Sequence, residues 1–149
     1  GSTLYLANML DLIGSGDVIA VDIDHSKFKV RHPRISLITG DSSAPQTLAA
    51  VQSIALGRNG LVIHDGDHRR EHVLADLHAY SRYVSPGSYL IVEDTVIDLF
   101  RSGDGLGNVN GPLKAVEQFV REDSRFSIDL GRESFLLTFN PQGYLKRTS

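Results

Sequence analysis

The sequence contains no cysteine among its 149 residues. This absence excludes disulfides, a thiol nucleophile and a thiolate metal site, so any metal has to be bound by aspartate, glutamate or histidine. No apolar run approaches the ~20 residues that a membrane-spanning helix needs, and residues 1–14 lack the basic segment of a secretion signal. We therefore expect a soluble protein, and of the compartments the cytoplasm.

The sequence has no large excess of charge of either sign. It holds 15 lysines and arginines against 18 aspartates and glutamates, a formal net charge of -3. No broad field would concentrate nucleic acid or an anionic membrane, so a small molecule is the expected partner. The G-x-x-x-x-G-K-[ST] phosphate loop and the G-x-S-x-G serine motif are also absent, which disfavours nucleotide hydrolysis and serine hydrolysis.

What the sequence does contain is a regular alternation of strand and helix patterns. Helical spacing covers 3–13, 45–56 and 69–84 and resumes at Pro112, and the intervening apolar runs are "DVIAVDID", "ISLITGDSS", "GLVIHDGDH" and "SYLIVEDT". This order predicts an α/β fold, a Rossmann-like, doubly wound and mainly parallel sheet. The last two runs, "RFSIDL" and "SFLLTFN", flank a turn at 131–133 and predict a C-terminal antiparallel hairpin.

Acidic residues follow each of the four predicted parallel strands. They are Asp22 and Asp24, Asp41, Asp65 and Asp67, and Glu93 and Asp94. Because the carboxyl ends of parallel strands meet at one edge of a sheet, we expect these acids to converge on a ligand-binding rim. Carboxylate oxygens suit hard cations such as Mg²⁺, and Asp65, Glu93 and Asp94 are the predicted ligands.

A plainer alternative is that these acids only cap the helices that follow them. Asp65 or Asp67 could serve the helix at 69–84 in this way, but Glu93 and Asp94 have no obvious helix start after them. Asp22 could either bind ribose hydroxyls or merely end its strand.

Two short motifs suggest other chemistries. His68-Arg69-Arg70-Glu71-His72 matches H-x-x-E-H, the pattern of inverted zinc peptidases, but no later helix offers a clear third carboxylate ligand. We therefore regard that match as accidental. Residues 22–24 and 65–67 each match D-x-D, a weak signal for a metal-dependent glycosyltransferase that binds a sugar nucleotide.

The order of the segments resembles a class I S-adenosylmethionine-dependent methyltransferase. The resemblance is closest to the cephalosporin hydroxylase family, also called rhamnosyl O-methyltransferase-like, through "GSTLYLANMLDLIG", "VIAVDID", "ISLITGDSS", "IHDGDH", "YLIVEDT", "NGPLKAVEQFV" and "FLLTFNPQGYLKR". It spans nearly the whole chain, and the tail is its most family-specific part.

The resemblance implies S-adenosylmethionine and a divalent cation, Mg²⁺ or another, as cofactors. It implies Asp22, with Asp24 beside it, at the ribose, Asp41 and Ser42 at the adenine, and Gly1 and Ser2 at the end of a glycine-rich turn. It also implies the metal on Asp65, Glu93 and Asp94. The word "hydroxylase" carries no chemistry here, since no convincing set of two histidines and one carboxylate for iron is present.

One departure from that family concerns the start of the sequence. In the family a strand with a glycine-rich turn precedes Gly1-Ser2 and lies at the centre of the sheet. We therefore expect residues 1–149 to be a single, N-terminally truncated domain that lacks the first central strand. Either its neighbours close up, or a second chain supplies a strand and makes a homo-oligomer. Whether Gly1-Ser2 is native or a cloning remnant stays open.

The expected function is metal-assisted methyl transfer to a hydroxyl group of a sugar or secondary metabolite. His68, three residues beyond Asp65, is the predicted acceptor of the hydroxyl proton, since imidazole titrates in the required range. The glycine-rich segment 101–111 is the predicted lid, with Asn108 and Asn110 reaching substrate hydroxyls. The alternatives are a degraded methyltransferase fold that only binds ligands or oligomerises, and the D-x-D glycosyltransferase.

Overall fold

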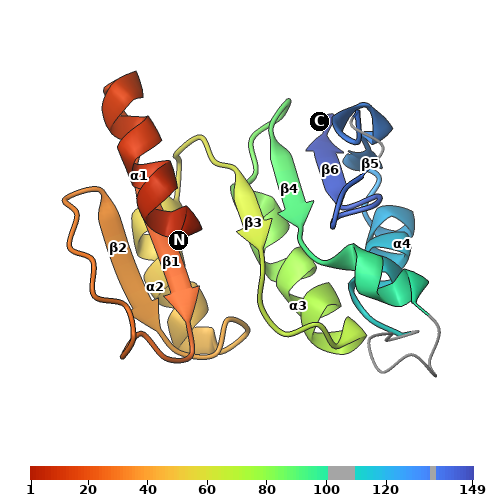
Figure 1. Cartoon of the computed structure of the whole chain (residues 1–149), viewed down its shortest axis with the longest axis horizontal. Helices are drawn as coiled ribbons and strands as arrows, with labels where there is room; N and C mark the ends of the chain where they lie inside the picture. The colour runs from red at the N-terminus through yellow and green to blue at the C-terminus, as the bar shows by residue number, and fades with distance from the viewer. Residues whose placement is uncertain (101–109, 135–136) are drawn as a thin grey trace. The chain divides into compact units, whose positions relative to one another are not determined.

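The computed structural model describes residues 1–100, 110–134 and 137–149, and the described residues form a mixed α/β structure (Figure 1). The mixed α/β class predicted from the sequence is confirmed. The chain divides into two compact units, Gly1–Ile54 and Ala55–Ser149. None of the described helices is long and apolar enough to cross a membrane.

The first unit is built on two parallel strands. Strand β1 (Val18–Asp22) pairs with β2 (Ile35–Thr39) from Val18 opposite Ile35 to Asp22 opposite Thr39. Figure 1 shows α1 (Ser2–Ile13) in front of this pair and α2 (Pro45–Ala55) behind it. Helix α1 ends at Gly14, whose φ of 86° is a left-handed conformation that glycine adopts without a steric penalty.

The second unit contains a four-stranded sheet in the order β3-β4-β6-β5. Strands β3 (Val62–His64) and β4 (Tyr89–Val92) are parallel, whereas β6 (Tyr144–Arg147) runs antiparallel to both β4 and β5 (Phe126–Ile128). Helices α3 (Arg70–Tyr80) and α4 (Pro112–Glu122) accompany it, with short 3₁₀ helices at η1 (Ser81–Tyr83), η2 (Thr95–Leu99) and η3 (Leu130–Arg132).

The hydrophobic core of the second unit lies between this sheet and the two helices. Its buried side chains come from every layer: Val73, Leu77, Val84, Leu90, Val92, Ala115, Val116, Phe119, Phe126 and Leu145. Each large apolar side chain removed from water in this way contributes about 1.5–3 kcal/mol to folding. The parallel ends of β3 and β4 are therefore held on a well-packed base.

The C-terminal antiparallel pair exists, but its second strand was placed wrongly from the sequence. The described residues of "SFLLTFN", 134 and 137–140, lie outside any strand, and the strand is β6, farther along. Leu137 is 90% exposed and Phe139 is 75% exposed, whereas Leu145 of β6 is fully buried. The strand that pairs with both β4 and β5 is the one that buries Leu145. Packing between distant segments therefore outweighs the strand preference of the more apolar run at 134–140.

The described strands form two separate sheets, one of two strands and one of four. A continuous, doubly wound sheet, and a single domain over residues 1–149, both stay predictions.

A candidate metal centre at the ends of β3 and β4

The acids predicted as metal ligands follow two strands that are direct neighbours. The register pairs His64 with Val92, the last residue of each strand. The Glu93 N–H donates to the His64 carbonyl oxygen at 2.9 Å, which continues the parallel pairing by one step. Asp65 and the Glu93-Asp94 pair therefore emerge side by side, as the argument from parallel strand ends requires.

Three side chains from these two strand ends form a group with the spacing of metal ligands. One ligand atom each from Asp65, His68 and Asp94 lies within 4.8 Å of the other two. His68 Nε2 is 3.3 Å from Asp94 Oδ2. Ligands that share one Mg²⁺ at ~2.1 Å in octahedral geometry lie about 3–4 Å apart, so a small contraction would make the group a binding site.

Glu93 adds a third carboxylate to this neighbourhood. Partial burial raises the pKa of Glu93, and the nearby negative charges of Asp65 and Asp94 raise it further. Three carboxylates that repel one another in this way would be stabilised by a bound cation. The predicted ligands Asp65, Glu93 and Asp94 would offer oxygen only, which suits a hard divalent ion such as Mg²⁺, whereas the group with ligand spacing contains His68 in place of Glu93.

Asp67 has different partners from Asp65, although both residues belong to the same D-x-D pattern. Its carboxylate accepts hydrogen bonds from the Arg69 backbone N–H at 2.8 Å and from Arg69 Nε at 2.9 and 3.0 Å. These bonds hold the pKa of Asp67 well below its usual range. Asp67 is thus engaged by Arg69, outside the candidate ligand set.

The acids after β3 and β4 do not cap the helices that follow them. Helix α3 begins after Arg69 as N-cap residue, and no side chain caps it. The short helix η2 does follow Asp94, which the sequence did not suggest, but the Asp94 side chain makes no capping bond to it. Since α3 begins at Arg70, His68 lies before the helix and cannot share one of its turns with His72, as the zinc-peptidase pattern requires.

The backbone of Asp94 adopts an uncommon conformation. Its φ of 56° and ψ of 24° are left-handed, which few residues other than glycine adopt. The Asp94 N–H donates to Asn140 Oδ1 at 2.9 Å. Asn140 is not predicted from the sequence, where the turn-forming "NPQG" in the tail is the only signal for it.

The residues predicted to bind the cofactor lie in the first unit, at the ends of β1 and β2. Gly40 N–H donates to the Asp22 carbonyl oxygen at 2.9 Å, so Asp22 and Asp41 leave neighbouring strand ends. Asp22 Oδ1 accepts from the Asp24 N–H at 3.0 Å, and Asp41 Oδ1 accepts from the Ser43 N–H at 2.8 Å. A carboxylate has about four acceptor positions, so the bond from Asp24 leaves Asp22 able to accept from ribose hydroxyls.

The remaining predicted cofactor residues have local roles. The carboxylate of Asp24 accepts from the Ser26 N–H at 2.7 Å and from its hydroxyl at 2.8 Å. Gly1 precedes α1 as its N-cap residue, and Ser2 is the first residue of that helix. Ser42 directly follows Asp41 in the turn before α2.

The predicted lid falls mostly outside the described residues, and Asn108 lies there with 101–109. Asn110 is described: its carbonyl oxygen accepts from the Arg70 N–H at 3.4 Å, and its Oδ1 accepts from Arg70 Nη1 at 3.5 Å. Asn110 therefore adjoins the start of α3.

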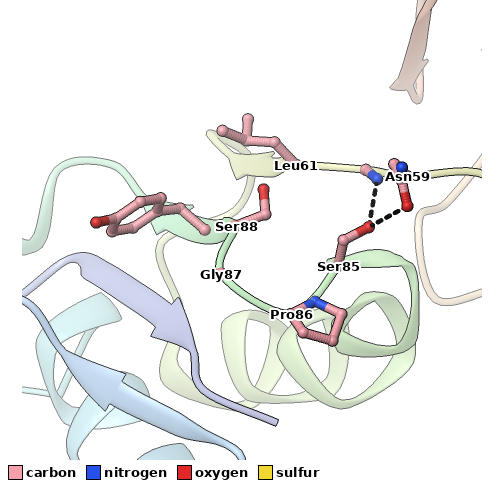
Figure 2. Close-up of a pocket in the computed structure, with 8 residues that line it drawn as sticks. Asn59, Leu61, Ser85, Pro86, Gly87 and Ser88 are labelled. Atoms are coloured by element: carbon pink, nitrogen blue, oxygen red, sulfur yellow. Dashed lines mark hydrogen bonds between the residues drawn. The ribbon is translucent and has the colours of Figure 1, made fainter.

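A hollow of about 540 Å³ lies at the opposite, amino ends of β3 and β4, lined by residues 59–61 and 85–89. Figure 2 shows the Ser85 hydroxyl there, which donates to Asn59 Oδ1 at 3.3 Å and accepts from the Gly60 N–H at 3.0 Å. None of the predicted site residues lines this hollow.

Comparison with known proteins decides the family. The family described as Rhamnosyl O-methyltransferase/CmcI matches residues 1–148. The chain belongs to this family. The resemblance inferred from the sequence is thereby confirmed.

Relatives in this family include the rhamnosyl O-methyltransferases of Mycobacterium leprae and Mycobacterium tuberculosis. The first is 32% identical over 158 residues, which cover 99% of this chain and 66% of that protein. The second is 32% identical over 155 residues, which cover 99% of this chain and 62% of that protein. The chain thus spans less than two thirds of the length of these relatives.

Two solved structures share the fold. A structure of CmcI with Mg and SAM has a TM-score of 0.65 at 20% identity and covers 100% of this chain and 60% of its own. The MycE methyltransferase from the mycinamycin biosynthetic pathway, in complex with Mg, SAH and mycinamycin VI, has a TM-score of 0.54 at 22% identity. That match covers 76% of this chain and 30% of MycE.

Proposed function

We propose that the whole protein is an S-adenosylmethionine-dependent, divalent-metal-assisted O-methyltransferase that acts on a hydroxyl group of a sugar or secondary metabolite. The observation that carries this proposal is the cluster of carboxylate side chains that follow the parallel strands β3 and β4, in a chain of the Rhamnosyl O-methyltransferase/CmcI family. A demethylmacrocin O-methyltransferase of Streptomyces fradiae, 33% identical over 79 residues, is a third relative whose name specifies O-methylation.

In this proposal Asp65, Glu93 and Asp94 hold the divalent cation. A bound Mg²⁺ supplies positive charge that lowers the pKa of the acceptor hydroxyl. Mg²⁺ prefers oxygen over imidazole nitrogen, so His68 is not needed as a ligand and its ring stays available for proton transfer.

His68 is the proposed acceptor of the hydroxyl proton. The His68 side chain is 38% exposed, although its Nε2 atom is buried and lies toward Asp94 Oδ2. Asp94 Oδ2, 3.3 Å from Nε2, would stabilise the positive charge that the imidazole gains with the proton. The proton would pass from the hydroxyl oxygen to His68 as the methyl group moves from the sulfonium sulfur of S-adenosylmethionine to that oxygen, with S-adenosylhomocysteine as the leaving group.

For the methyl donor we propose the residues at the ends of β1 and β2. Asp22, with Asp24, would accept hydrogen bonds from the ribose hydroxyls, while Asp41 and Ser42 would flank the adenine. Gly1 and Ser2 would adjoin the methionine part. Methyl transfer is a single in-line displacement, so these residues contribute mainly by holding the donor in position.

A thermal-shift panel on the purified chain tests the proposal. S-adenosylmethionine and Mg²⁺ together should raise the melting temperature more than either does alone. A rise with a sugar nucleotide and Mn²⁺, and none with S-adenosylmethionine, would instead favour the glycosyltransferase. No rise with either cofactor would favour a domain that only binds other ligands or oligomerises.

Methyl transfer itself is tested with S-adenosylmethionine that carries a labelled methyl group. Rhamnosides and mycinamycin VI are the acceptors to offer, since the names of the similar proteins mention a rhamnosyl group and mycinamycin VI. We expect label in an acceptor, and its loss when a chelator removes the metal.

A further inference from the structure

The left-handed backbone of Asp94 needs a structural cause, because an aspartate there is strained relative to its usual conformations. The surrounding contacts supply one. The Asp94 N–H donates to Asn140 Oδ1 at 2.9 Å, a bond between residues far apart in the sequence. The direction of a side chain follows from its backbone angles, so the bond bears on where the Asp94 carboxylate lies.

Asn140 belongs to a turn, Thr138–Gly143, that we name the tail turn. Within it, the Asn140 N–H donates to Thr138 Oγ1 at 3.0 Å. The Gly143 N–H donates to the Asn140 carbonyl oxygen at 2.9 Å. Both backbone polar groups of Asn140 are thereby bonded inside the turn, which holds its backbone in place.

The tail turn is attached to the chain on both sides of Asp94. On the N-terminal side of Asp94, the Val92 N–H donates to the Gly143 carbonyl oxygen at 2.8 Å. On the C-terminal side of Asp94, Thr95 Oγ1 donates to the Pro141 carbonyl oxygen at 2.7 Å. The Asn140 side chain bonds Asp94, which lies between these two attachments and whose backbone is left-handed.

We propose that Asn140 is a positioning residue for the metal site: its amide oxygen holds the Asp94 backbone in the conformation that turns the carboxylate toward Asp65 and His68. The inference rests on the proposed function, since it takes Asp94 as a metal ligand. Without the acceptor at 140, Asp94 relaxes toward an ordinary backbone conformation and its carboxylate leaves the group.

The test is Mn²⁺ binding by the full chain, measured by calorimetry and by the electron paramagnetic resonance signal of free Mn²⁺. Asn140→Ala removes the acceptor. Asn140→Asp keeps an oxygen in the same place. Thr95→Val is the matched control, because it breaks the neighbouring bond between the same two segments without touching the Asp94 N–H. Urea unfolding of each variant gives its stability.

We expect Asn140→Ala to weaken Mn²⁺ binding about 10- to 100-fold, the usual effect of losing a group that orients a ligand. Asn140→Asp should retain binding, and Thr95→Val should lose stability but bind Mn²⁺ as the wild type does. If Asn140→Ala does not fold, Asn140→Leu, which keeps the side-chain volume, takes its place with the same expectation.

Wild-type affinity in Asn140→Ala, or an equal loss in Thr95→Val, would overturn the positioning role and leave the proposed metal site standing. Failure of the wild-type chain to bind Mn²⁺ would remove the metal site itself, and this inference with it.

Discussion

His64 Nε2 lies 3.1 Å from Asp76 Oδ2, and this buried pair joins the last residue of β3 to the middle of α3. The two side chains are 9% and 10% exposed. Because His64 immediately precedes Asp65, the pair anchors the strand end from which the first proposed metal ligand projects.

Removal of the Asp76 carboxylate should therefore destabilise the protein. We expect Asp76→Ala to lower the free energy of unfolding by about 1–3 kcal/mol, because the buried imidazole loses its partner. Asp76→Asn, which keeps an acceptor oxygen, should lose less. Urea unfolding measures both, and equal stability of Asp76→Ala and the wild type would show that the pair contributes nothing.

Gly143 should not tolerate a side chain. A Cβ at this position would meet the Val92 carbonyl oxygen, since the tail turn lies against the end of β4 at this point. Gly143→Ala is expected to cost about 1–3 kcal/mol of stability, as other overpacked positions do. Gly1→Ala is the control, because its Cβ would meet no atom within 4 Å. Thermal denaturation of the two variants should separate them clearly, and equal melting temperatures would refute the close approach.

The Asp123–Arg125 pair predicts a dependence of stability on pH. Arg125 donates to the Asp123 carboxylate from Nε at 2.8 Å and from Nη2 at 2.6 Å, which holds the pKa of Asp123 below its usual value. A lowered pKa in the folded state stabilises the protein above the unfolded pKa of about 3.9, and this gain is lost as pH falls through the folded pKa.

Asp123→Asn should accordingly cost about 0.5–1 kcal/mol at neutral pH, a modest value because the arginine is partly exposed to solvent. The difference from the wild type should shrink toward zero in acid. Urea titrations across the acidic range provide the measurement, and a difference that does not change with pH would contradict the assignment.

The two possible roles of His68 predict different kinetics. If His68 accepts the proton, His68→Ala should lower kcat by about 10²–10⁴-fold, the usual contribution of a general base. Mn²⁺ affinity should stay at the wild-type level, because oxygen ligands hold the metal. A large loss of Mn²⁺ affinity would instead make His68 a ligand and would require another proton acceptor.

Much of the fold could be predicted from the sequence because its signals are local. The helix at 45–55 begins at a proline, and each parallel strand is an apolar run with an acid at its end or within two residues after it. The helix and the strands were therefore placed correctly from the sequence. The juxtaposition of Asp65 with Glu93 and Asp94 followed from parallel pairing alone.

The parts that could not be predicted depend on contacts between distant segments. The apolar run containing Leu137 and Phe139 looked like a strand, yet β6 forms beyond it, where Leu145 reaches the core. The bond from Asp94 to Asn140 spans 46 positions, and nothing local to either residue indicates it. Nor does the sequence around His64 reveal its partner on α3.

The central claim is that the acids after β3 and β4 bind a divalent cation. Calorimetric titration of Mn²⁺ into three forms of the chain tests this claim most directly. The forms are the wild type, Asp65→Asn and Asp67→Asn, two neighbouring acids of which the second is held by Arg69. We predict that the wild type and Asp67→Asn bind one Mn²⁺ with similar affinity, and that Asp65→Asn does not bind it. Equal binding by Asp65→Asn and the wild type would contradict the account.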